Sequence, residues 1–236
     1  MNPKEQGPER KELDLGKIEY LISDWDGTLV DSMPAYTESF SKTLEEALGV
    51  RRESAKRYYL STVGSPLSKQ LKEGAKRFAN IDVDDTTNLE KEFWRNLTGL
   101  IPEIIPRAKE FLTQVKRKGI KIVVWSGTRG DVLEEKIRLL SFSSFIDYSI
   151  GNEPGSSTLV KGPGLFREIA EYFGINEDEL REKSLVIGDG SGDITAGKAV
   201  GVTTIGIVRT QTAQAFQEAG ADIVVNGLEE LISLFK

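Results

Sequence analysis

The chain has 236 residues, of which 37 are acidic and 31 basic, and its formal net charge at pH 7 is -6. The two signs are interspersed, so the sequence has no basic stretch of the kind that binds nucleic acid or anionic membranes. The absence of cysteine and histidine excludes disulfides, thiolate nucleophiles, histidine-based triads and the usual zinc ligands, so any catalysis must rest on carboxylates, lysine, hydroxyl groups or a metal ion.

Small molecules are therefore the expected partners. No apolar run approaches the roughly 18 residues of a membrane span. Residues 1–12 are charged rather than apolar and show no secretory signal, so we expect a cytoplasmic protein. Nothing in the sequence indicates an oligomeric state.

Residues 1–16 are polar and predict a flexible extension. An apolar run at 18–22 predicts the first buried strand. Residues 34–100 then show only helical periodicity, with helices expected at 34–48, 52–60, 67–78 and 87–97. Because this stretch interrupts an α/β pattern, it predicts an inserted all-α subdomain.

From about residue 101 onward, helices and strands alternate. Strands are expected at 120–125, 147–150, 184–187, 203–208 and 222–225. Helices are expected between 106 and 119, at 131–140, 165–173, 194–200 and 212–219, and from 228. The alternation predicts an α/β fold with a doubly wound, Rossmann-like parallel sheet. We therefore expect an α/β core made of 17–33 and 101–236, and a helical cap made of 34–100.

Polar side chains follow several of the predicted strands. Asp24 and Asp26 come directly after the first strand, where Gly27 ends the apolar run. The carboxyl ends of parallel strands are where open α/β sheets bind ligands, and two acids there can divide nucleophilic, metal-binding and proton-transfer roles. An Asp-Gly pair is also a common turn, so this stretch by itself is equally consistent with a solvated turn.

Three later loops carry groups that match these acids. Ser126 and Gly127 follow the strand at 120–125 and offer donors to an anion, although a Ser-Gly pair is usually only a turn. Lys161 precedes a helix and offers an ammonium to a phosphate, although most lysines are simply solvated. Asp189 and Asp193 follow the strand at 184–187 and offer carboxylates to a hard cation.

The residues exclude two nucleotide-binding motifs. The run G-D-G-S-G-D at 188–193 lacks the third glycine of a dinucleotide fingerprint and has Asp193 in its place, and no G-K-S or G-K-T is present for a Walker A loop. Taken together, the four loops would gather four carboxylates, one ammonium and one hydroxyl. Four acids without a cation repel one another, and Mg²⁺, which prefers oxygen ligands and shares them with phosphate, is the natural partner.

The four loops resemble the four signature motifs of the haloacid dehalogenase superfamily. DWDGTLVDS at 24–32 resembles the first motif, VVWSGT at 123–128 the second, KGPGLF at 161–166 the third, and VIGDGSGDITAGKAVGV at 186–202 the fourth. The helical stretch after the first motif resembles the cap of the subgroup that contains phosphoglycolate phosphatase and β-phosphoglucomutase. The resemblance implies a phosphatase that uses Mg²⁺ and acts on a small phosphorylated metabolite.

The resemblance also implies roles for individual residues. Asp24 would be the nucleophile that forms an aspartyl-phosphate, and Asp26 would protonate the leaving oxygen and then activate water. Ser126, Gly127 and Lys161 would hold the phosphoryl oxygens.

On the same basis Asp24, the carbonyl of Asp26 and Asp189 would bind Mg²⁺, and Asp193 would orient Lys161 or a water bound to the metal. Three residues depart from the usual motifs, namely Ser23, Gly162 and Gly190, and none of them removes a charge that the mechanism needs.

The loop around Gly64 and Ser65 resembles a cap loop that contacts substrate, but it is equally consistent with a plain helix connector. Arg129 and Arg209 fall in loops near the same edge and are weaker substrate candidates. A phosphomutase would share every catalytic residue named here. A haloacid dehalogenase would need the first aspartate but neither the metal nor Asp26, and a binding module on the same fold would need none of the six groups.

Overall fold

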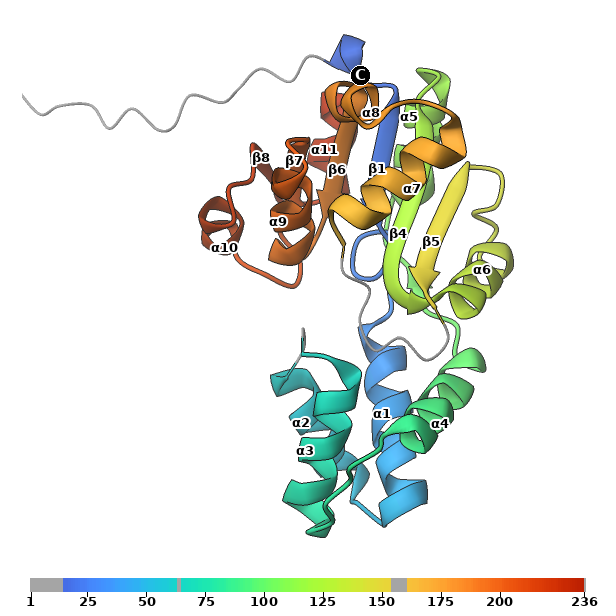
Figure 1. Ribbon diagram of the computed structural model, residues 1–236, viewed down its shortest axis with the longest axis vertical. Helices are drawn as coiled ribbons and strands as arrows, with labels where there is room; N and C mark the ends of the chain where they lie inside the picture. Colours follow the sequence, from blue (N-terminus) through green and yellow to red (C-terminus); the bar gives the residue numbers. More distant parts are fainter. Residues whose placement is uncertain (1–14, 63–64, 154–160, 236) are drawn as a thin grey trace, which may run out of the picture.

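The computed structural model describes residues 15–62, 65–153 and 161–235. Its centre is a six-stranded parallel sheet in the order β5-β4-β1-β6-β7-β8, which confirms the predicted doubly wound α/β fold (Figure 1). The strands are β1 (Tyr20–Asp24), β4 (Lys121–Arg129), β5 (Tyr148–Asn152), β6 (Ser184–Gly188), β7 (Thr203–Ile207) and β8 (Ile223–Val225). Strands β1 and β6 are buried along their whole length because helices cover both faces of the sheet.

Successive residues of the strands point into two separate apolar clusters. Leu21 of β1 packs toward α5 (Ala108–Arg117), α6 (Gly130–Leu139) and α11 (Leu228–Leu234). Ile22, the next residue, packs toward α7 (Pro163–Phe173), α8 (Glu177–Lys183) and α9 (Ser191–Ala199). The last helix to be placed, α10 (Ala213–Glu218), packs Phe216 against Gly206 of β7, where a side chain would not fit.

Four helices lie beyond the carboxyl ends of the strands (Figure 1). They are α1 (Met33–Leu48), α2 (Arg52–Ser61), α3 (Leu67–Ala79) and α4 (Thr87–Thr98), and we call them the helical segment. They share an apolar cluster built around Phe40, Leu44 and Phe93, which Val132 of α6 also joins. The two chain connections that join the segment to the sheet pair with each other as β2 (Val30–Asp31) and β3 (Glu103–Ile104), which are antiparallel.

Several local details differ from the expectations. Helix α8 was not predicted, because Leu180 is its one buried side chain and leaves no apolar period to detect. Strand β4 continues through the expected Ser-Gly turn to Arg129, because β5 pairs with it again beyond an irregularity. Helix α9 begins at Ser191, so Asp193 lies in its first turn.

The predicted extension at 1–16 lies outside the described residues except at its end, where Leu15–Lys17 form a 3-10 helix. The division into a core and a cap stays a prediction. Among the described helices, none is both long enough and apolar enough to cross a membrane.

The two edge strands are anchored in the same way. Asp147 precedes β5, and its Oδ2 accepts hydrogen bonds from the amide of Ile122 and from Lys116, both at 2.8 Å. Asp222 precedes β8, and its Oδ2 accepts from the amide of Thr204 at 2.9 Å. Burial alone would raise the pKa of both carboxyls. Hydrogen bonds from a lysine, Lys116 for Asp147 and Lys198 for Asp222, and from the backbone outweigh burial and lower the pKa of each.

We expect Asp147→Asn and Asp222→Asn each to lower the free energy of unfolding at pH 7 by about 1–2 kcal/mol, because each removes a charge-assisted bond from a partly buried site. A lowered folded-state pKa stabilises the protein above the unfolded-state value of about 3.9 and stops doing so as the pH falls through the folded-state value. The difference from wild type should therefore shrink in acid. Urea unfolding between about pH 7 and pH 3 measures it, with the exposed Asp82→Asn as control. A difference that is constant over this range would contradict the prediction.

Candidate active site

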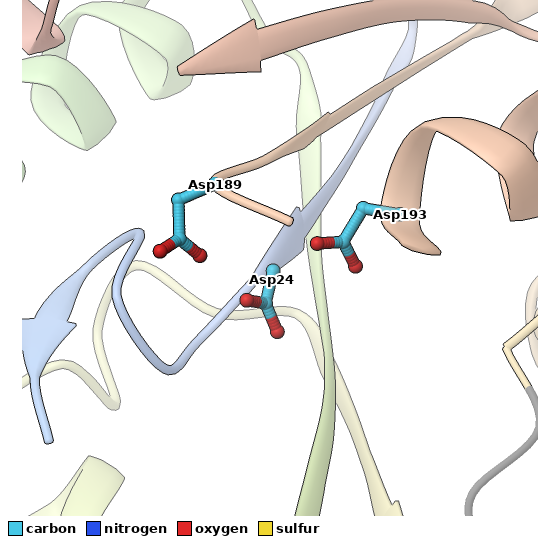
Figure 2. A group of neighbouring side chains, drawn as sticks. All are labelled: Asp24, Asp189 and Asp193. Atoms are coloured by element: carbon cyan, nitrogen blue, oxygen red, sulfur yellow. The ribbon is translucent and has the colours of Figure 1, made fainter. Parts of the chain in front are cut away.

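Acids from two of the predicted motifs converge at the carboxyl edge of the sheet. Asp24 ends β1, Asp189 follows β6, and Asp193 lies in the first turn of α9. Figure 2 shows their carboxylates turned toward one another, and one oxygen of each lies within 4.8 Å of the others. All three side chains are buried. The parallel sheet thus gathers acids that are far apart in sequence at one point, where open α/β sheets bind ligands.

Lys161 brings the third motif to this cluster. Its Nζ lies 2.6 Å from Oδ1 of Asp24 and 2.6 Å from Oδ1 of Asp193, so a single ammonium bridges two carboxylates. The ammonium also lies 5.7 Å from the centre of the Trp125 ring, whose face favours a cation. The structure therefore brings Lys161 together with two of the predicted acids, and the roles given to Lys161 and Asp193 stay predictions.

Burial and charge shift the pKa values in this cluster. Burial raises the pKa of Asp24 well above its usual range, and the nearby acids add to the increase while Lys161 opposes it. Burial likewise raises the pKa of Asp189. Burial would lower the pKa of Lys161, but the charges of Asp193 and Asp24 outweigh it and the pKa is raised, so the lysine keeps its proton. The cluster is short of positive charge, and its donor set of buried carboxylate oxygens suits a hard divalent cation.

Asp189 is held in place by two threonines and a glycine. Thr210 Oγ1 lies 2.7 Å from Oδ2 of Asp189, and Thr28 Oγ1 lies 3.3 Å from its Oδ1. Gly27 has φ +80°, and a Cβ there would lie 2.1 Å from Asp189 Oδ2. The glycine is therefore needed twice, once for its left-handed backbone and once because the carboxylate occupies the space of a side chain.

The side chain of Asp26 faces the second motif. Its Oδ2 accepts hydrogen bonds from Ser126 Oγ at 2.6 Å and from Thr128 Oγ1 at 2.8 Å. Thr128 also hydrogen-bonds the hydroxyl of Tyr36, on the first turns of α1. Because the one proton of Thr128 goes to Asp26, Tyr36 must donate in that contact. The motif-based prediction gave Ser126 to phosphate, and its bond to Asp26, like the whole contribution of Thr128 and Tyr36, was not foreseen.

A cavity of about 430 Å³ separates the helical segment from the ends of β4 and β5. Arg129 and Asn152 line its sheet side, and α3 and α4 supply Lys72, Lys91 and Trp94 on the other side. None of the clustered aspartates lines it, and its own acidic lining consists of Asp84, Asp85, Glu90 and Glu153. The guanidinium of Arg129 pairs with Asp131 and lies 5.9 Å from the centre of the Trp94 ring.

The other weak candidates lie elsewhere. Ser65 precedes α3 and does not line the cavity, and Gly64 lies outside the described residues. The guanidinium nitrogen Nη2 of Arg209 lies 3.6 Å from Oδ2 of Asp31, at the connection to the helical segment. The role of Gly64 and Ser65 in substrate binding stays a prediction.

Comparison with known proteins agrees with the motifs. The family of haloacid dehalogenase-like hydrolases matches residues 18–201. The chain belongs to this family. A phosphoglycolate phosphatase from Aquifex aeolicus is 25% identical to this haloacid dehalogenase-like hydrolase, in a match that covers 78% of this chain and 82% of the relative. A phosphorylated carbohydrates phosphatase from Thermotoga maritima is 24% identical over 93% and 99% of the two chains.

Solved structures share the fold of the hydrolase. One from Thermotoga maritima, provisionally named a β-phosphoglucomutase, superposes with a TM-score of 0.69 and 24% identity and covers 92% of this chain and 98% of its own. At that identity the likeness shows the fold alone.

We expect Gly27→Ala to displace Asp189 and to weaken the binding of a divalent cation by at least about tenfold, because a clash is added to about 1–2 kcal/mol of backbone strain. Titration calorimetry with Mg²⁺ measures the affinity. Gly49→Ala is the matched control, since Gly49 has φ +68° but nothing within 4 Å of its missing Cβ. If both variants lose the same stability and keep wild-type Mg²⁺ affinity, Gly27 acts only through its backbone.

Proposed function

We propose that this hydrolase is a Mg²⁺-dependent phosphatase that cleaves a small phosphomonoester through an aspartyl-phosphate on Asp24. The proposal rests on one observation above all. Asp24 shares one carboxylate oxygen with the Lys161 ammonium, 2.6 Å away, and belongs to the same acid cluster as Asp189. A nucleophile placed between a fixed ammonium and a cation-binding group meets the needs of attack on a phosphate dianion.

In the first step, an oxygen of Asp24 attacks phosphorus while the bond to the leaving oxygen breaks, and Asp26 donates a proton to that oxygen. In the second step, Asp26 takes a proton from water, whose oxygen attacks phosphorus and releases phosphate and free Asp24. Lys161 stays protonated throughout and holds a phosphoryl oxygen, and Asp193 keeps the ammonium in place. Ser126, which donates to Asp26 in the free enzyme, would donate to a phosphoryl oxygen of the bound substrate.

Asp24 and Asp189, with the backbone carbonyl of Asp26, would hold Mg²⁺. The ion supplies charge neutralisation, which lets a phosphate approach a cluster of acids. The helical segment would act as the cap that excludes water and selects the substrate, and the cavity that Arg129 and Trp94 line would receive the leaving group.

The alternatives differ in what they require. A haloacid dehalogenase attacks with the first aspartate but needs no metal-binding acids, so Asp189 and Asp193 favour the phosphatase. A phosphomutase would use the same groups, and only the fate of the phosphoryl group separates the two. A binding module without activity would have no use for a buried nucleophile beside a partly buried lysine.

The test is phosphate release from a panel of phosphomonoesters that includes phosphoglycolate and sugar phosphates. We expect release with Mg²⁺, none with chelator, and a loss of several orders of magnitude in Asp24→Asn, as when other covalent nucleophiles are removed. Asp178→Asn, on the exposed face of α8, is the control and should keep wild-type activity.

Each failure has a separate meaning. The absence of release from every substrate would defeat the phosphatase proposal. Undiminished release from Asp24→Asn would remove the nucleophile from the mechanism. Conversion of one sugar phosphate into its isomer would identify a mutase, and halide release without metal would identify a dehalogenase.

A further inference from the structure

Strand β4 carries a bulge at the second motif. It advances from Trp125 to Arg129 while its partner β5 advances only from Ile150 to Asn152. Ser126, Gly127 and Thr128 of β4 lie between these two pairs, opposite Gly151 alone in β5. Bulges of this kind are common beside active sites because they redirect side chains. Here the bulge directs Ser126 toward Asp26.

One peptide group within the bulge is held at both ends. The carbonyl oxygen of Gly127 accepts a hydrogen bond from Asn152 Nδ2 at 2.7 Å. On the other side of the same peptide, the amide of Thr128 donates to Ser126 Oγ at 2.9 Å. Because the carbonyl and the amide of a trans peptide point in opposite directions, Asn152 fixes the direction in which the Thr128 amide points.

The chain of bonds then reaches the acid. Ser126 Oγ accepts from the Thr128 amide, so its single proton is free to turn toward the site, where it is donated to Asp26 Oδ2 at 2.6 Å. Asn152 is thus connected to the Ser126 hydroxyl through one peptide group.

The hydrogen bond from Asn152 to the Gly127 carbonyl is accompanied by a free-energy cost. Asn152 is only 7% exposed, and its Oδ1 is buried without a partner among the described residues. An apolar side chain would avoid that unsatisfied oxygen. The preceding residue must be glycine, because a Cβ on Gly151 would lie 2.6 Å from the Thr128 carbonyl oxygen. The backbone at the end of β5 therefore lies directly against the backbone of the bulge.

We propose that Asn152 is a positioning residue for catalysis. It holds the Gly127–Thr128 peptide so that the Ser126 hydroxyl donates into the active site, to Asp26 in the free enzyme and to a phosphoryl oxygen of the substrate. The inference rests on the proposed phosphatase function. A purely structural Asn152 would instead fasten the edge strand β5 to β4 and affect stability alone.

A double-mutant cycle separates these two roles. We expect Asn152→Ala and Ser126→Ala each to lower kcat/KM for a phosphomonoester by about tenfold, the size of one hydrogen bond. The double variant should be no worse than Ser126→Ala alone, because Asn152 acts through that hydroxyl. The inhibition constant of inorganic phosphate should follow the same pattern.

Asn152→Asp provides a second variant of the same shape that turns an acceptor toward the Gly127 carbonyl, and it should lose at least as much activity as Asn152→Ala. It keeps the test decisive if the alanine variant fails to fold. Ser184→Ala is the control, since Ser184 is also buried, its hydroxyl has no partner in the described chain, and it starts β6 away from the bulge. It should keep wild-type kcat/KM.

Multiplied effects in the double variant would overturn the positioning role, and so would wild-type kcat/KM in both Asn152 variants. These results count only when the wild-type enzyme releases phosphate and Asp24→Asn does not. A failure of the phosphatase proposal is thus recognised before the cycle is measured. If the enzyme is active and the two losses in kcat/KM multiply in the double variant, only the role of Asn152 is overturned.

Discussion

The ammonium of Lys161 is the contact on which the site depends. It lies between Asp24 and Asp193, with Asp189 close by, so one positive charge on a side chain that is only 17% exposed faces three buried acids. Removing one partner from such a buried pair typically costs about 3–5 kcal/mol, because the remaining charge is left unpaired. The surrounding sheet must therefore hold several like charges close together, in a group of acids that could take up a metal ion. The two apolar clusters on either side of β1 provide the rigid support for it.

Most of the sheet could be predicted because its strands are buried on both faces. A strand such as β1 or β6 then appears as a continuous apolar run, and the polar residue that follows marks the edge where ligands bind. Parallel order brings the ends of β1 and β6 side by side, so the meeting of Asp24 with Asp189 follows from topology. The approach of Lys161 does not follow from topology in this way. The sequence offered its ammonium as one possibility beside a solvated lysine, and the resemblance to a family gave it a role.

The parts that could not be predicted depend on single side chains rather than on periodicity. Helix α8 buries only Leu180, although Asn176 accepting from the Glu179 amide is a start signal that the sequence does carry. The bulge in β4 is invisible to any apolar pattern, because it arises from where β5 resumes pairing. Since that register decides whether Ser126 faces Asp26 or solvent, sequence alone could name the serine but could not give its partner.

The edge strand β5 connects stability to the site. At its start Asp147 accepts from the amide of Ile122, and at its end Asn152 donates to the carbonyl of Gly127, so side chains fasten both ends of β5 to β4. Between these points the backbone ladder holds the strands in register up to Trp125. An edge strand lacks a neighbour on its other side, and these side-chain bonds compensate for that. The bulge that carries Ser126 is thus framed between the last ladder pair and Asn152. Its geometry is therefore set in part by an edge strand.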